Sequence, residues 1–162
     1  MINAGKVSLK FFAREDLSGV SYDLDEFQSK YTSSASFALN RIARRNTGQE
    51  FAVTVFCHAV PAGFFTLDFG EDKLELTGNQ KSVLLRSLSV NPAMQGKGIG
   101  KAVMAEVEQF LRKHFKDCDE IVLAVNTDNI FAYDLYLKAG YLCEGKTREG
   151  RNGLQYLMAK RF

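Results

Sequence analysis

The sequence has little net charge and no long apolar run, and each absence excludes a class of protein. Its 162 residues carry a formal net charge of only +2, which is too small to indicate a nucleic-acid partner or an anionic membrane surface. No stretch approaches the roughly 18 consecutive apolar residues of a membrane span, and the N-terminal residues do not have the pattern of a signal peptide. We therefore expect a cytoplasmic protein without a nucleic-acid or membrane partner.

Cysteine and histidine are too few and too scattered for a metal centre. Cys57, Cys118 and Cys143 show no paired metal-ligand spacing, and His58 and His114 do not complete one. We expect free, buried thiols in a reducing compartment and no metal. His58 follows Cys57 in an apolar run, so we expect it to be packed in a strand rather than catalytic.

What the sequence does contain is typical of one α/β domain, over residues 1–162. Its 46% hydrophobic and 25% charged residues are ordinary globular values. Helix-like patterns occupy residues 34–45, 98–115 and 130–139, and strand-like patterns occupy 6–11, 50–60, 62–69, 83–90, 120–125, 141–148 and 154–161. We expect an antiparallel pair turning at Pro61, a loop with little strand at 70–82, and a strand-helix-strand unit in the second half. The fold class is then α/β (α+β), with a mixed, mostly antiparallel central sheet flanked by helices.

Three glycines, Gly96, Gly98 and Gly100, stand between a predicted strand and a predicted helix. A P-loop needs four residues between its first glycine and the Gly-Lys pair, followed by Ser or Thr; here there are three, and Ala102 stands at the Ser or Thr position. The dinucleotide fingerprint GxGxxG fails because Val103 occupies its last glycine position. Glycines at such a junction allow positive φ and leave the first helical N–H groups open to a phosphate. A tight turn without a ligand is the alternative.

Two motifs resemble the GNAT superfamily of acyl-CoA-dependent N-acyltransferases. Gln95, Gly98 and Gly100 match QxxGxG within LSVNPAMQGKGIGKAVM, and NIFAYDLYLKAGY at residues 129–141 matches NxxAxxLYxxxG[FY]. The chain is similar to this family over residues 83–148, fits it in the antiparallel strands before them, and resembles it only in outline in the N-terminal third. The resemblance implies a GNAT-like sheet with a strand, glycine turn and helix forming the cofactor site.

The resemblance also implies acetyl-CoA as co-substrate and assigns residues to it. The strand before the turn would splay from its successor, and its backbone at Leu88 and Val90 would pair with the pantetheine amides. Asn129 resembles the residue that contacts the pantetheine arm, and it can also cap the following helix. The turn would hold the pyrophosphate through Gln95, Gly96, Lys97, Gly98, Ile99, Gly100 and Lys101. Lys97 and Lys101 either add charge there or are ordinary solvated lysines at a helix start.

The activity implied is direct transfer of an acetyl group from the thioester to a primary amine. Tyr136 resembles the family tyrosine near the CoA sulfur, where it would assist the leaving thiolate by hydrogen bonding and proton donation. An amine of pKa ~10.4 loses its proton at a cost of about 4.6 kcal/mol at pH 7, so a base is useful. A backbone N–H near Val90 would stabilise the charge on the carbonyl oxygen. Residues 83–90 carry no carboxylate. We therefore prefer Asp68 over the acidic residues that follow it, either as the base or as a group that attracts a cationic amine.

Several alternatives stay open at this point. The acceptor is a small-molecule amine, a peptide N-terminus or a protein lysine, and a homodimer is compatible with the way GNAT sheets often pair. A non-catalytic acyl-CoA-binding module of the same fold would account for the missing strand carboxylate. A protein or nucleic-acid interaction domain is suggested by Arg41, Arg44 and Arg45, although arginines also favour the negative end of a helix dipole.

Overall fold

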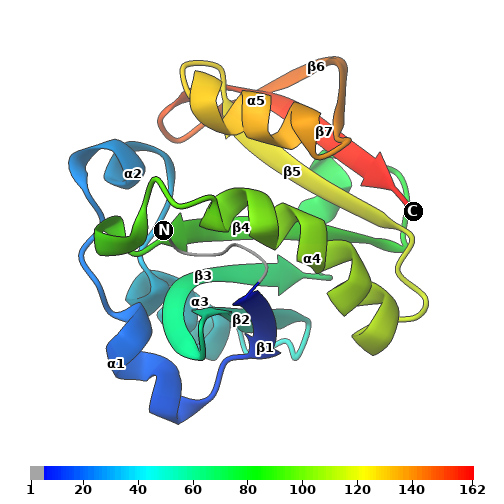
Figure 1. Cartoon of the computed structure of the whole chain (residues 1–162). Coiled ribbons are helices and arrows are strands. Elements are labelled where there is room, and N and C mark those ends of the chain that lie inside the picture. The colour runs from blue at the N-terminus through cyan, green and yellow to red at the C-terminus, as the bar shows by residue number, and fades with distance from the viewer. Residues whose placement is uncertain (1–5) are drawn as a thin grey trace.

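The computed structural model describes residues 6–162, which form one mixed sheet with helices on both faces (Figure 1). The seven strands lie in the order β1-β2-β3-β4-β5-β7-β6. Neighbouring strands are antiparallel except for β4 and β5, which are parallel. The mostly antiparallel sheet predicted from the sequence is confirmed. The strands are β1 (Val7–Phe11), β2 (Glu50–Cys57), β3 (Val60–Asp68), β4 (Ser82–Val90), β5 (Glu120–Asn126), β6 (Leu142–Gly150) and β7 (Gly153–Arg161).

The helices cover both faces of the sheet, and alternate side chains of β3 contribute to the core on each face. Phe65 belongs to the larger core, which α4 buries with Ile99 and Val103, whereas Phe64 packs with Val20 of α1 and Ala38 of α3. Helix α5 lies next to α4, and α2 lies near the end of β4 (Figure 1). The helices are α1 (Leu17–Val20), α2 (Glu26–Tyr31), α3 (Ala35–Arg45), α4 (Ile99–His114) and α5 (Ile130–Lys138), with 3-10 turns η2 (Arg14–Asp16), η3 (Glu71–Glu75) and η4 (Pro92–Met94).

Strands β4 and β5 open a gap in the sheet. Within the described residues they pair only where residues 82–84 lie opposite 120–122, and beyond that point they diverge (Figure 1). Ser87 has a φ of 60°, and the register with β3 shifts there, between Phe64 and Thr66. Such a bulge bends its strand, so β4 turns away from β5. The splayed strand that the resemblance implied is confirmed.

A buried ion pair lies beneath this bulge. The Arg41 guanidinium donates two hydrogen bonds to the Glu50 carboxylate, and its Nη2 lies 3.4 Å from Ser87 Oγ. Thr66 Oγ1 donates to the same carboxylate at 2.8 Å. Burial raises the pKa of Glu50, but the hydrogen bonds from Arg41 and Thr66 outweigh burial and hold that pKa below its ordinary value. Arg41 is therefore an internal residue that ties α3 to the sheet and to the bulge.

We expect Glu50→Gln to lower the free energy of unfolding by about 3 kcal/mol, because it leaves the buried Arg41 charge without its partner. Urea unfolding at pH 7 measures the loss, with the exposed Glu149→Gln as the control expected to change little. Because the folded state lowers the pKa of Glu50, its contribution is present above the ordinary glutamate pKa and is lost as pH falls through the folded value. The difference between wild type and variant should therefore narrow in acid; equal stabilities at pH 7 would contradict this role.

The structure corrects the sequence prediction in three details. His58 and Ala59, with φ of 51° and 65°, form the β2–β3 turn, whereas Pro61 lies inside β3 opposite Phe56 at a register irregularity. His58 is consequently exposed, not packed. Residues 71–75 form the 3-10 helix η3 where a loop with little strand was predicted. The predicted strands and the three predicted helices are otherwise confirmed, with differences at their ends.

Candidate functional site

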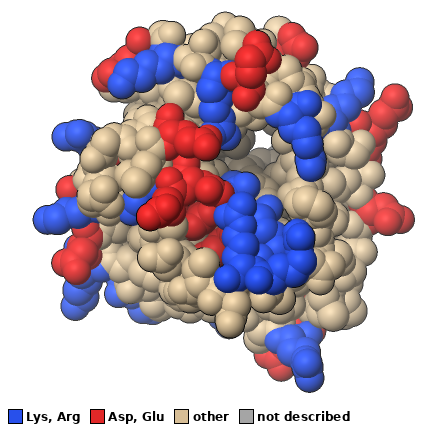
Figure 2. Space-filling view, turned by 180° about the vertical axis from the view of Figure 1, so that it is seen from behind, with Lys and Arg blue, Asp and Glu red and all other residues tan. Residues whose placement is uncertain are grey.

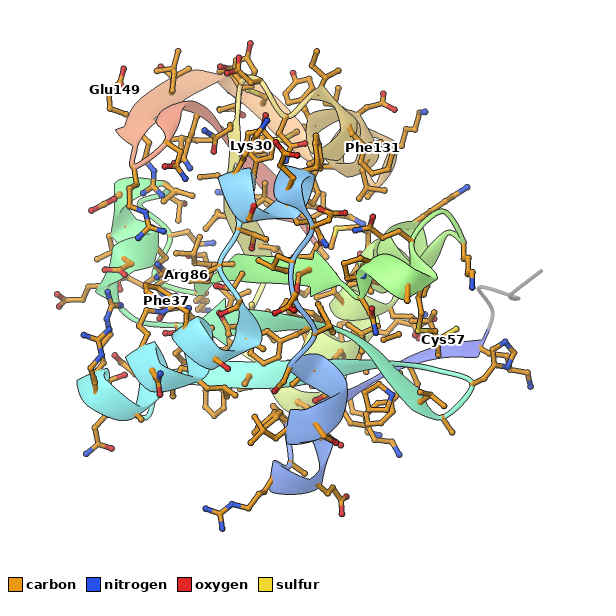
Figure 3. The ribbon with its side chains drawn as sticks, turned by 90° about the vertical axis from the view of Figure 1, so that its left-hand side faces the viewer. Lys30, Phe37, Cys57, Arg86, Phe131 and Glu149 are labelled. Atoms are coloured by element: carbon orange, nitrogen blue, oxygen red, sulfur yellow. The ribbon has the colours of Figure 1, made fainter. Side chains whose placement is uncertain are left out.

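The gap between β4 and β5 holds a cavity of about 660 Å³, a volume typical of small-molecule sites. Its walls are residues 85–90 of β4, 123–126 of β5, the glycine turn, the first turns of α4 and α5, and one side of α2. Figure 3 shows α2, with Lys30, and α5, with Phe131, above β4 where that strand leaves the sheet. Three helices therefore converge on one opening.

The glycine turn presents unpaired backbone donors to this cavity. Gly96 and Gly98 have φ of 75° and 78°, a conformation that strains any residue with a Cβ. The first α-helical hydrogen bond of α4 runs from the Ala102 N–H to the Gly98 carbonyl at 3.1 Å, so the N–H groups of residues 99–101 have no helical carbonyl to bind. Together with the positive end of the α4 dipole, these groups favour a phosphate-type anion.

The structure brings all but one of the residues predicted for the cofactor to this cavity. Lys97 is exposed and does not line it, whereas Lys101 does. Of the two lysines, only Lys101 therefore lies at the cavity. The predicted residues that line it are Leu88, Val90, Gln95, Gly96, Gly98, Ile99, Gly100, Lys101, Asn129 and Tyr136.

The free edge of β4 is occupied by a side chain of α2. The Asn91 N–H bonds to the Ala62 carbonyl of β3 at 2.8 Å, so the backbone groups of the preceding Val90 point the other way, toward the gap. There Gln28 Nε2 donates to the Val90 carbonyl at 2.9 Å, and the Val90 N–H donates to Gln28 Oε1 at 3.0 Å. The Gln28 amide thus pairs with Val90 in the way an added strand would.

Helix α5 supplies two buried polar groups to the cavity. The Asn129 Oδ1 accepts from the Ala132 N–H at 3.2 Å and caps the helix, which leaves its amide nitrogen for a ligand. Tyr136 lines the cavity and is 9% exposed. Burial raises the pKa of Tyr136 to about 12, so its hydroxyl stays protonated at neutral pH and is a hydrogen-bond donor.

Asp68 does not line the cavity that Tyr136 lines, nor a smaller cavity that adjoins it on the side of α3. Its buried carboxylate accepts from the Gly70 N–H at 2.8 Å and from Arg86 Nη1 at 3.2 Å. Asp72 also pairs with Arg86, and the hydrogen bond from Arg45 is the largest influence that lowers the pKa of Asp72. Asp68 therefore forms an ion pair with Arg86 that fixes the position of the guanidinium group. Within residues 6–162, no carboxylate lines the cavity.

Gln28 and Phe131 are among the cavity residues that the sequence does not reveal. Neither belongs to a motif position, and Phe131 stands between the defining positions of NIFAYDLYLKAGY. One signal was available for α2: Asp25 caps it by accepting from the Gln28 N–H at 2.7 Å. Phe131 is 74% exposed at the cavity edge, so a ligand bound there would contact it.

Other kinds of site find no support among residues 6–162. No group of three metal-ligating side chains occurs there, and the cysteines are free, with Cys57 and Cys118 buried and Cys143 partly so. No helix in this range is long and apolar enough to cross a membrane.

The sequence and the structure are both similar to those of known N-acetyltransferases. The sequence model described as "Acetyltransferase (GNAT) family" matches residues 18–141. The uncharacterized N-acetyltransferase YbbJ of Bacillus subtilis (strain 168) is 33% identical over 154 residues, covering 94% of this chain and 95% of that protein. Two solved structures share the fold: spermidine N-acetyltransferase from Vibrio cholerae in complex with CoA and spermine (18% identity, TM-score 0.70, 97% of this chain and 96% of that one), and AAC(6')-Ib in complex with paromomycin and acetyl-CoA (15% identity, TM-score 0.76, 96% and 93%).

Proposed function

The chain belongs to the acetyltransferase (GNAT) family, and from this premise we propose that it transfers an acetyl group from acetyl-CoA directly to a primary amine. The family makes it an acyltransferase that uses acetyl-CoA as donor. One observation supports the finer proposal: unpaired N–H groups, the edge of β4 that faces the gap and a protonated tyrosine line one cavity. Acceptors of the solved neighbours, spermidine and aminoglycosides, are amines.

The residues that would hold acetyl-CoA follow from the groups that the cavity offers. The N–H groups of residues 99–101, with Lys101, would bind the pyrophosphate. The β4 edge at Leu88 and Val90 would pair with the amides of the pantetheine arm, as an added strand does. The Asn129 amide nitrogen would donate to the same arm. These groups fit the co-substrate, which would displace the Gln28 amide from Val90 on binding.

Bound acetyl-CoA would supply an acetyl thioester, and the protein would position it and stabilise the developing charges. The Tyr136 hydroxyl would donate a hydrogen bond to the sulfur as negative charge develops there, and its raised pKa keeps the hydroxyl protonated. A backbone N–H of β4 near Val90 would hold the carbonyl oxygen. The amine would lose its proton to water, since the described part of the chain brings no carboxylate to the cavity.

The Gln28 amide occupies the Val90 groups that this proposal gives to pantetheine. We expect Gln28→Leu to tighten acetyl-CoA binding by about 5- to 30-fold, the equivalent of one or two hydrogen bonds that no longer have to be exchanged. Calorimetric titration of both proteins measures the change, and Ser29→Ala, an exposed neighbour on α2, is the matched control. Weaker binding in Gln28→Leu would instead make Gln28 a positioning residue for β4.

Titration of acetyl-CoA into the purified protein, with ATP and NADH as comparison ligands, is the first test of the proposed function. Binding of acetyl-CoA alone is expected, followed by CoA release when an accepted amine is added. Binding without release against a broad amine screen would favour the alternative, a non-catalytic acyl-CoA-binding module of the same fold, which the absence of a carboxylate in VLLRSLSV also motivates. Absence of acetyl-CoA binding would contradict both.

A further inference from the structure

A second cavity of about 370 Å³ adjoins the first on the side of α3. The two share residues 31, 32, 85–87, 124 and 126, so the gap between β4 and β5 runs through the sheet. The Thr32 hydroxyl lies at this junction, buried and without a hydrogen-bond partner among the described residues. An acceptor bound in the second cavity would approach the gap from the face opposite the glycine turn.

The charged residues that line this second cavity are all arginines. Arg41, Arg86, Arg148 and Arg151 reach it, and no Asp or Glu of residues 6–162 does. Figure 2 shows the corresponding face, where basic side chains border a hollow and acidic side chains gather to one side of it. Arg86 and Phe37 both line this cavity, whereas Figure 3 shows Glu149 pointing away into solvent.

Three of these arginines are held by carboxylates outside the cavity. Arg41 pairs with Glu50, Arg86 with Asp68 and Asp72, and Arg148 with Glu75 at 2.6 Å. These pairs are locally neutral, and they fix the guanidinium groups in place.

Arg151 differs, because no carboxylate of the described residues lies within ion-pair distance of it. Its guanidinium stacks instead over the Phe37 ring, 5.8 Å from the centroid. Its position is fixed by the next residue: the Asn152 side chain donates to the Lys30 carbonyl of α2 at 2.8 Å, and the Asn152 carbonyl accepts from Asn126 of β5 at 3.0 Å. The tip of the β6–β7 hairpin thus closes over the cavity and carries an uncompensated positive charge to it.

From this cavity we propose that the acceptor is a small amine that also carries an anionic group, a carboxylate or a phosphate, which Arg151 binds. The inference rests on the proposed acetyl transfer and defines its substrate class. Spermidine and aminoglycosides, the acceptors of the solved neighbours, carry several positive charges and would face the uncompensated charge of Arg151 in a cavity that no carboxylate of residues 6–162 lines, which is unfavourable. An anionic group would complete a charge-assisted, bidentate pair with Arg151.

No carboxylate of residues 6–162 lines either cavity, so the amine gives up its proton to water. The anionic group, bound at Arg151, secures the molecule while the amine lies toward the gap. Transfer then needs water alone as proton acceptor, and the amine nitrogen forms the new bond to the acetyl carbon as the bond to sulfur breaks.

Matched acceptor pairs test the inference directly. Lysine and cadaverine differ by a carboxylate, and phosphoethanolamine and ethanolamine differ by a phosphate; spermidine and kanamycin serve as polycations. With saturating acetyl-CoA and CoA release as readout, we expect the anionic member of at least one pair to have a kcat/KM about tenfold higher or more, the effect of one such ion pair. The pair that shows the difference identifies the anion.

A charge reversal separates a role for Arg151 from general electrostatics. We expect Arg151→Glu to raise the acceptor KM of the anionic member about tenfold or more and to shift preference toward the partner that lacks the anionic group, with the acetyl-CoA KM unchanged. Lys146→Glu, an exposed residue of the same hairpin outside the cavity, makes the same change in net charge and should have little effect. Equal effects of the two variants, or better use of spermidine or kanamycin by wild type, would overturn the inference.

If no member of the pairs is acetylated, the same pairs are titrated into the CoA complex. Binding of an anionic member to wild type and its loss in Arg151→Glu would support the inference; binding of neither class would overturn it. Failure of acetyl-CoA itself to bind is a different result, since it contradicts the proposed function and is measured before any acceptor is added.

Discussion

Acetyl-CoA binding should fall about 100-fold or more in Gly96→Glu, because a carboxylate in the turn repels the pyrophosphate with about 4 kcal/mol for each charge pair near 4 Å at a surface. Gly96 lines the cavity at a φ of 75°, and a Cβ added there meets nothing within 4 Å. The substitution therefore places its charge at the site without a steric clash. Calorimetric titration of acetyl-CoA measures the loss.

Gly48→Glu is a closely matched control for this variant. Gly48 has a φ of 72°, open space around its would-be Cβ, and an exposed position between α3 and β2, so it carries the same backbone strain and the same added charge far from the turn. We expect both variants to lose a similar amount of stability, about 1 kcal/mol, from the left-handed conformation. Loss of acetyl-CoA binding in both would mean that strain or net charge, not the turn, is responsible.

The second half of the fold was predictable from the sequence because its signals are local. Gly98 marks the start of α4, and the apolar stripe of that helix, including Val103 and Val107, is buried as predicted. Asn129 caps α5 at the position the motif gives. Each of these features depends on residues within a turn or two of one another, which is the range that patterns in a single sequence describe.

The remaining features of the site depend on contacts between residues far apart in the sequence, which patterns in the sequence do not reveal. Gln28 meets Val90 across 62 positions, and Arg148 meets Glu75 across 73. Helix α2 has only six residues, too few for an amphipathic pattern to emerge. Asp68 was selected as a base from its place after an apolar strand, and its partner Arg86 became apparent only once β3 and β4 were side by side.

The difference between local motifs and long-range contacts also separates the two substrates. The groups assigned to acetyl-CoA lie on local motifs that the family shares, whereas the arginines that line the acceptor cavity come from α3, β4 and the β6–β7 hairpin. Among them, Arg151 sits at the hairpin tip, where a change of residue alters no strand pairing. Acceptor preference can therefore change within this fold while the acetyl-CoA site stays the same, which is why a neighbour's acceptor is a weak guide to the acceptor of this chain.

We expect Tyr136→Phe to lower kcat about 10- to 100-fold and to leave acetyl-CoA affinity nearly unchanged, because it removes a hydrogen-bond donor that stabilises the thiolate as it leaves. Burial raises the pKa of Tyr136 to about 12, so the group is lost as a donor only as pH rises through that value. Below pH 10 the wild type and the variant should therefore show pH profiles of the same shape and different height. Disappearance of a limb in this range would mean that Tyr136 titrates and acts as a base.

Tyr141→Phe is the matched control, since the two rings are neighbours with centroids 5.8 Å apart. The Tyr141 hydroxyl is buried, has no hydrogen-bond partner among the described residues, and does not line the cavity. Removing it should leave kcat unchanged. Stability should stay the same or rise by up to about 1 kcal/mol, because the substitution removes a buried polar group that makes no hydrogen bond. If both variants lose activity equally, the loss reports disturbed packing of the aromatic pair; if only Tyr136→Phe loses it, the hydroxyl at the cavity acts on the leaving sulfur.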